Sequence, residues 1–285
     1  MLYFCADDYG ISEGANSRIE NCLEHGVLNQ ISVLPNGTFR ELKERFSEKN
    51  VRLSLHLNLV EGRPLSDPKE IGLLVSEDGA FRDSFVGLFF RALLPGRRAL
   101  EKQIYRELQS QLRFWKQMMG ANTPLLVDSH QHTHMIPLVF RTLLRVIEDE
   151  QMNVQTIRIP AEPLSPYLLT PSLYLEYSPV GLVKQWLLKA CAAINRKELK
   201  KTKIRPAYFM GVLFSGNVNE KRIRKLLPKY LRLAEKHNKD VEIGLHPGYM
   251  EDGEEMIEGC RAGFKKFYFS PGRKIEYDAL MHLKP

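Results

Sequence analysis

Short apolar segments of strand-like character alternate with amphipathic helical segments along most of this chain. A β–α–β pattern appears within the first ~35 residues, where two apolar stretches flank a segment of helical spacing that ends at Gly26. Such alternation predicts a mostly parallel sheet. The strands are expected at 2–6, 31–37, 51–60, 124–130, 154–160, 207–214 and 241–248.

About seven strands in ~250 residues are typical of an open or distorted TIM-like (β/α) barrel rather than of two domains. We therefore expect an α/β fold in which one barrel domain covers residues 1–285. A helical excursion is expected around 161–206, and amphipathic helices at 99–119 and 140–150. A further helix should lie between the last two strands, with Pro228 disturbing it.

The composition is that of a soluble globular protein, with 44% hydrophobic and 26% charged residues. The formal charge of +7 is partly local, because the stretch 196–205 holds six basic residues and one acidic residue. No nucleic-acid-binding motif accompanies it, so no nucleic-acid partner is expected. The stretch is interpreted as a solvated basic loop, with an anionic substrate or a membrane surface as the alternatives.

Targeting signals are not expected. The four cysteines lack CxxC spacing, which indicates reduced thiols in a cytoplasmic protein, and no secretion signal is recognisable. The nearest approach to a membrane span is 180–194, but Lys184, Gln185 and Lys189 interrupt it, so no integral membrane segment is expected.

Polar residues stand near the carboxyl ends of five predicted strands. In α/β barrels that end carries the active site. A lone inward histidine is usually a hydrogen-bonded core residue, but five polar strand ends together are harder to explain in that way. The residues are Asp7, Asp8, His56, Asn58, Asp128, His130, Arg158 and His246.

Three of the eight histidines lie in the short stretch VDSHQHTHM, residues 127–135. If the strand continues, His130, His132 and His134 share a face and span about 14 Å, too far for all three to bind one ion. One of them, with His56 and a carboxylate, could form a three-ligand metal site with an open position. We expect one ligand, one residue that supports a ligand or contacts substrate, and one structural residue.

The adjacent acids Asp7 and Asp8 suggest a division of roles. In a regular strand they would point to opposite faces, whereas at a strand–loop junction both can reach one pocket. One could then bind a metal while the other takes a proton from water. The alternative is a turn in which both acids cap the following helix.

Five motifs together resemble the YdjC-like carbohydrate deacetylases, the family of chitooligosaccharide deacetylase and a hopanoid-biosynthesis-associated deacetylase. The resemblance runs from residue 3 to about 250. The motifs are ADDYGISEGAN, SLHLNLVEGRPL, VDSHQHTHM, IRIP and GLHPG, in that order. The resemblance implies a distorted barrel that removes acetyl from an N-acetylated, chitooligosaccharide-like sugar with one divalent metal ion, Mg or Zn. It also implies a possible homodimer.

The resemblance assigns roles residue by residue. It implies that the metal ligands are Asp8, His56 and His130. Asp7 takes the place of the general base and His246 that of the general acid. Arg158 resembles the arginine that orients the base in the related polysaccharide deacetylases. Substrate-binding or ligand-supporting roles are expected for His132, Asn58 and Asp128.

One departure from the family pattern lies beside the site, because Cys5 stands where family members often have Asn or Thr. It could change the pocket wall or the metal preference.

The residues by themselves are also compatible with two other functions. The HQHTH stretch is also similar to histidine-rich metal-dependent phosphoesterase sites, and the basic charge would suit a phosphate. A non-catalytic sugar-binding barrel is the second alternative. Hydrated metals hydrolyse amides, esters and phosphates, so deacetylation rests on the family resemblance.

Overall fold

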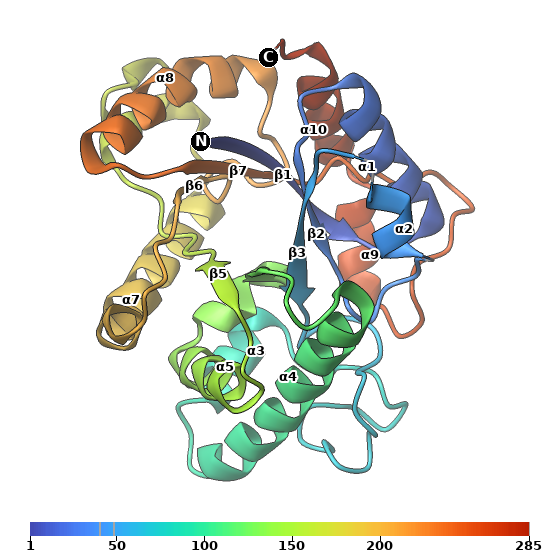
Figure 1. The fold of residues 1–285 in the computed structure, drawn as a ribbon. Helices are drawn as coiled ribbons and strands as arrows, with labels where there is room; N and C mark the ends of the chain where they lie inside the picture. The colour runs from blue at the N-terminus through green and yellow to red at the C-terminus, as the bar shows by residue number, and fades with distance from the viewer. Residues whose placement is uncertain (40, 48, 285) are drawn as a thin grey trace.

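A single parallel sheet forms the centre of the computed structural model, which describes residues 1–39, 41–47 and 49–284. Its seven strands follow the order β5-β4-β3-β2-β1-β7-β6 and curl into a half-barrel (Figure 1). In the described chain β5 and β6 form no ladder with each other, so the barrel is open. The strands are β1 (Leu2–Tyr9), β2 (Gln30–Val33), β3 (Arg52–Leu57), β4 (Leu125–Ser129), β5 (Val154–Ile157), β6 (Tyr208–Met210) and β7 (Val241–Leu245). This confirms the predicted distorted α/β barrel.

Helices surround the sheet (Figure 1). They are α1 (Glu13–His25), α2 (Leu42–Phe46), α3 (Phe85–Arg91), α4 (Arg97–Met119), α5 (Pro137–Asp149), α6 (Ser165–Leu168), α7 (Pro179–Lys201), α8 (Glu220–His237), α9 (Ala262–Tyr268) and α10 (Pro271–His282). Two short 3₁₀ segments, η1 (His130–Met135) and η2 (Pro171–Glu176), follow β4 and α6. The largest apolar core runs from Phe4 to Leu283 and joins the helices to the sheet.

The strands are buried on both faces, as a parallel sheet between helices requires. In β3, Leu55 and Leu57 enter the main core while His56 turns the other way, as the alternation predicts. All five residues of β4 and of β7 are buried. Polar side chains can therefore reach the cavity only where the strands end.

Three predicted elements differ from the structure. The strand predicted at 207–214 ends at Met210, because Gly211 adopts φ +143° and the carboxylate of Glu162 accepts the backbone N–H groups of residues 211–213. Helix α8 runs without a break through Pro228. The basic stretch predicted as a loop is largely helical, since residues 196–201 form the last turns of α7.

The segment 161–206 contains α6, η2 and α7. In the described residues, no helix is both long enough and apolar enough to cross a bilayer.

Candidate active site

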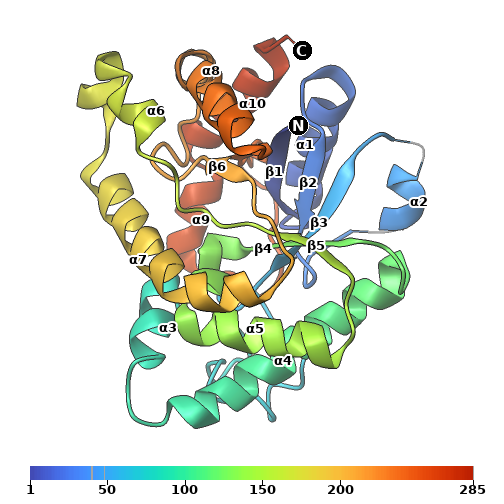
Figure 2. The ribbon, with the colours of Figure 1, turned by 60° about the vertical axis from the view of Figure 1, so that its left-hand side comes forward.

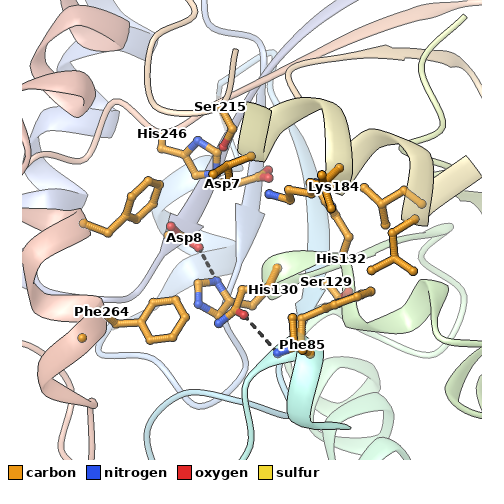
Figure 3. Close-up of a pocket in the computed structure, with 18 of the residues that line it drawn as sticks. Asp7, Asp8, Phe85, Ser129, His130, His132, Lys184, Ser215, His246 and Phe264 are labelled. Carbon is orange, nitrogen blue, oxygen red and sulfur yellow. Dashed lines mark hydrogen bonds and ion pairs between the residues drawn. The ribbon is translucent and has the colours of Figure 1, made fainter. Parts of the chain in front are cut away.

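A cavity of about 630 Å³ opens at the carboxyl ends of the strands. The polar residues on its wall are Asp7, Asp8, His56, Ser129, His130, Gln131, His132, Lys184, Ser215 and His246. The rest of the wall is mostly apolar and comes from α3, α7 and α9. The structure thus brings residues from the ends of β1, β3, β4 and β7 into one cavity (Figure 3).

An irregularity at the end of β1 explains why Asp7 and Asp8 both line this cavity. Ala6 pairs with Ile31 and Tyr9 with Val33, so the register against β2 shifts between them. Asp8 has φ +67°, a left-handed conformation that aspartate tolerates better than most residues. The extra residue of this bulge turns two consecutive side chains toward the same side of the sheet.

Asp8, His56 and His130 are close enough to bind one ion. Oδ1 of Asp8 lies 2.8 Å from Nδ1 of His130 and 3.3 Å from Nε2 of His56. Figure 3 shows the side chains of Asp8 and His130 pointing toward each other. Burial alone would raise the pKa of Asp8, but His130, Arg273 and hydrogen bonds from both histidines outweigh it and hold the pKa well below its ordinary value. Asp8 is therefore ionised and could serve as a metal ligand.

Two further observations show that these residues fit a cation. Nε2 of His130 is buried without a partner, and all three candidate ligand atoms lie within 4.8 Å of one another. Two other acid-containing groups are as compact, Cys5–Asp128–Glu242 and Asp7–His56–Asp128. The Arg158 guanidinium contacts every carboxylate of those two groups, and although Arg273 contacts Asp8 in the same way, only the Asp8 group also holds the unpartnered Nε2 of His130. The Asp8 group is the better candidate for a metal.

Asp128 fixes the ring of His56. Its Oδ1 lies 2.5 Å from Nδ1 of His56, and Ser32 also hydrogen-bonds this carboxylate. Holding one ring nitrogen in this way directs the other nitrogen, Nε2, toward Asp8, a pattern common in metal-binding histidines. Burial lowers the pKa of His56, but Asp128 and Asp8 outweigh it and raise the value to about 10.

Arg158 holds Asp7 in a bidentate ion pair. Nη1 and Nη2 of the arginine donate to the two carboxylate oxygens at 2.7 and 2.9 Å. The same guanidinium contacts Glu242 at 2.6 Å and Cys5 Sγ at 3.1 Å, and all of these side chains are buried. The fork geometry fixes the plane of the Asp7 carboxylate while the carboxylate still lines the cavity. Cys5 therefore lies behind the cavity wall, in contact with Arg158.

His246 lies across the cavity and is held by Glu276. The carboxylate of Glu276 accepts the backbone N–H of His246 at 2.6 Å and lies 3.3 Å from Nδ1 of its ring. Glu276 is fully buried, whereas the side chain of His246 remains 17% exposed. An imidazole held at one nitrogen by a carboxylate can transfer a proton at the other.

The strand predicted at 124–130 does not continue through His132 and His134. β4 ends at Ser129, and the chain turns into η1 with left-handed φ values at Gln131 and His132. The hydroxyl of Ser129 accepts the backbone N–H of His134 at 2.9 Å and so closes this turn. Local hydrogen bonds of this kind compete with strand continuation.

The three histidines consequently face different surroundings. His130 points to Asp8, and His132 lines the cavity wall against Phe209. His134 is fully buried, with Nδ1 2.6 Å from Ser129 Oγ and Nε2 2.7 Å from the carbonyl oxygen of Arg158. His134 thus links the turn to the end of β5.

His134 gives the fold a pH dependence. Burial lowers the pKa of His134 to about 4, below its ordinary 6.5. As pH falls through 6.5 the unfolded chain binds a proton that the folded chain does not bind until about pH 4, so stability decreases across this window. The expected loss for this residue is about 2 kcal/mol between pH 7.5 and pH 5. Guanidinium unfolding at both pH values should show a smaller loss for His134→Gln than for the wild type. Equal losses in the two proteins would contradict this role.

Asn58 does not line the cavity. Its side-chain amide donates to Asn36 Oδ1 and to the carbonyl oxygen of Glu61, and its Oδ1 accepts the backbone N–H groups of Val60 and Glu61. Every polar group of the side chain is used within the loop after β3. We assign Asn58 to loop structure rather than to substrate contact.

Two buried residues of α10 were not predicted from the sequence. Arg273 donates to Oδ2 of Asp8 at 2.5 Å and stacks 3.9 Å from the ring centroid of Tyr268, and Glu276 holds His246. They lie three positions apart on the face that also buries Ala279 and Leu280. Opposite charges at that spacing on the apolar face of a helix are the signal that could have indicated them.

Comparisons with known proteins place the chain among relatives that match it over most of its length. The family model for YdjC-like protein matches residues 1–284. A carbohydrate deacetylase of Danio rerio is 24% identical over 98% of this chain and 91% of its own length. One of Geobacillus stearothermophilus is 30% identical over 74% of this chain and 81% of its own.

The fold also recurs in a solved structure. A crystal structure of a proposed cellobiose-phosphate cleavage protein of Enterococcus faecalis superposes with a TM-score of 0.64, at 16% identity, over 98% of this chain and 90% of that one. At this identity the likeness concerns the fold alone. On the family match over nearly its whole length, the chain belongs to the YdjC-like family.

Proposed function

We propose that this protein is a metal-dependent hydrolase that removes the acetyl group from an N-acetylated sugar. One observation carries the proposal: Asp8, His56 and His130 converge in a cavity that Asp7 and His246 also line. The cavity thus offers a candidate ion site, a carboxylate base and an imidazole acid together. Relatives that match nearly the whole chain are named carbohydrate deacetylases, which supports the same chemistry.

Asp8, His56 and His130 would hold the ion. When bound, a divalent cation supplies a Lewis acid for the acetyl carbonyl and lowers the pKa of a water molecule. Two imidazoles and one carboxylate leave a position open for that water, as in catalytic zinc sites. The same groups with added waters also suit magnesium.

Asp7 accepts the proton of the attacking water. Its paired hydrogen bonds with Arg158 fix the direction of the carboxylate, which lines the cavity. The new C–O bond converts the acetyl carbon to a tetrahedral centre.

His246 donates a proton to the sugar nitrogen as the C–N bond breaks. An amide nitrogen leaves poorly unless it is protonated, and buried Glu276 holds the ring at Nδ1, so Nε2 is the nitrogen that makes the transfer. The products are acetate and the free amine. His132 lines the cavity wall, and in this proposal it contacts the sugar.

The test is acetate release from N,N′-diacetylchitobiose and from its 6-phosphate. Chelated protein is assayed with zinc, with magnesium and with no metal added back. We expect acetate from at least one of the two sugars, only when a metal is present. If no metal yields acetate while the 6-phosphate loses phosphate, the phosphoesterase alternative replaces this proposal. Binding of both sugars with neither product would indicate a non-catalytic barrel.

A further inference from the structure

Large apolar side chains are exposed mainly in two segments of the described chain. Outside 86–94 and 164–194, only Met1, Leu65, Leu231 and Ile275 are exposed to a comparable degree. Single exposed apolar residues are normal, but a contiguous group of them marks an interaction surface. The chemistry of the cavity does not explain why these two segments expose so many apolar side chains.

The first segment is α3 with the turn that follows it. Its inner side chains, Phe85 and Phe89, pack against the core. Its outer side chains, Val86 and Phe90, are 53% and 59% exposed, and Leu93 and Leu94 continue them at 61% and 56%. The spacing of three to four residues places these groups on one side of the helix.

The second segment is the first half of α7, which is apolar on its outer side as well as its inner side. Val180, Val183 and Trp186 are 78%, 69% and 64% exposed, while Leu188 is buried. A helix face that carries several large apolar side chains is normally covered by other parts of the protein or by a partner. The protein covers only one side of this half of α7.

The two segments meet at the mouth of the cavity. Phe85 and Phe89 of α3 share an apolar cluster with Leu188 and Cys191 of α7, so the two helices are neighbours. Figure 2 shows α3 and α7 on the same side of the molecule. Val86 and Val183 line the cavity although both are exposed, so the rim of the opening is apolar. We call the exposed residues of α3, the 92–96 turn and α7 the α3–α7 surface.

Basic residues flank the α3–α7 surface, and acidic residues are missing from its sequence. Exposed Arg97 and Arg98 follow the α3 segment, and exposed Lys197 and Lys201 continue the outer stripe of α7 at helical spacing. The stretches 84–100 and 177–197 contain neither aspartate nor glutamate, in a chain that has 34 acidic residues. An exposed tryptophan, aliphatic side chains and a basic margin are characteristic of segments that enter the headgroup region of a membrane.

We propose that the α3–α7 surface docks on the face of an anionic phospholipid membrane, so that the cavity opens at the headgroup layer. The charge favours this occupant over a second copy of the chain. In a two-fold dimer the same surface meets itself, so its basic margin would face like charge, whereas anionic lipids neutralise it. The proposal does not depend on the reaction performed in the cavity.

The test is co-sedimentation with vesicles. Wild-type protein is mixed with vesicles of phosphatidylcholine alone or of phosphatidylcholine with phosphatidylglycerol. The triple variant Phe90→Ser/Leu94→Ser/Trp186→Ser removes three exposed groups that do not line the cavity. The matched control is Leu231→Ser/Ile275→Ser, in which two exposed apolar residues of α8 and α10 are changed. Circular dichroism and the unfolding midpoint establish that each variant is folded.

We expect the wild type and the control to bind the anionic vesicles, and the triple variant to bind about tenfold or more weakly. Lys197→Gln/Lys201→Gln should weaken binding to anionic vesicles and leave binding to phosphatidylcholine unchanged. Failure of the wild type to bind anionic vesicles would overturn the proposal. So would light scattering that shows a wild-type dimer and a monomeric triple variant, neither of which binds vesicles. Equal weakening in the triple variant and the control would also overturn it.

Discussion

Asp7→Asn is expected to keep its metal and to lose turnover of the N-acetylated sugar by about 10²–10⁴-fold. Asparagine has the shape of aspartate but cannot take a proton from water. Arg158 retains Asp128 and Glu242 as partners, so the surroundings of residue 7 should remain in place. The measurements are kcat for acetate release and the metal content of the purified protein.

Asp252→Asn, a change of the same kind at an exposed position, is the matched control and should leave kcat unchanged. Near-normal turnover in Asp7→Asn would show that the base is another group. Loss of metal together with turnover would instead place Asp7 among the ligands.

His130→Ala is expected to weaken metal binding by at least about 100-fold, and activity should fall with it. The change removes one of the three ligand atoms and leaves Asp8 with His56 and Arg273. Titration calorimetry with zinc and with magnesium measures the affinity directly, independently of any substrate. The control is His25→Ala, because His25 is exposed at the end of α1.

If His130→Ala binds the metal with unchanged affinity, the metal site is one of the other two acid-containing groups and not the Asp8 group. His56→Ala then distinguishes them, because His56 belongs to the Asp7–His56–Asp128 group and not to the Cys5–Asp128–Glu242 group.

The sheet and the strand ends were predictable from the sequence. A parallel strand buried on both faces must be almost wholly apolar, so polar residues at its carboxyl end stand out. For this reason Asp7, Asp8, His56 and His246 are recognisable from the sequence alone. Their separate roles rested on the family resemblance, because spacing alone does not distinguish a ligand from a base.

In the histidine stretch, the two-residue repeat of a strand no longer predicts which way the side chains point. A strand continues only while a neighbouring strand supplies hydrogen bonds, and the β4–β5 ladder ends at the pair Val127–Ile157. Beyond it, Ser129 closes a turn that separates His130, His132 and His134. The spacing of the histidines was visible, but the backbone conformation that separates them was not.

The sequence by itself determined the order of strands and helices, the polar strand ends and the apolar character of residues 180–194. These properties follow from local periodicity and composition. Only the tertiary structure decided that Arg273 and Glu276 of α10 reach Asp8 and His246, residues far away along the chain. It also decided that the outer side of α7 is left uncovered at the cavity mouth. Both outcomes depend on how distant elements pack, because burial of a side chain is a property of its neighbours in space and not of its position in the chain.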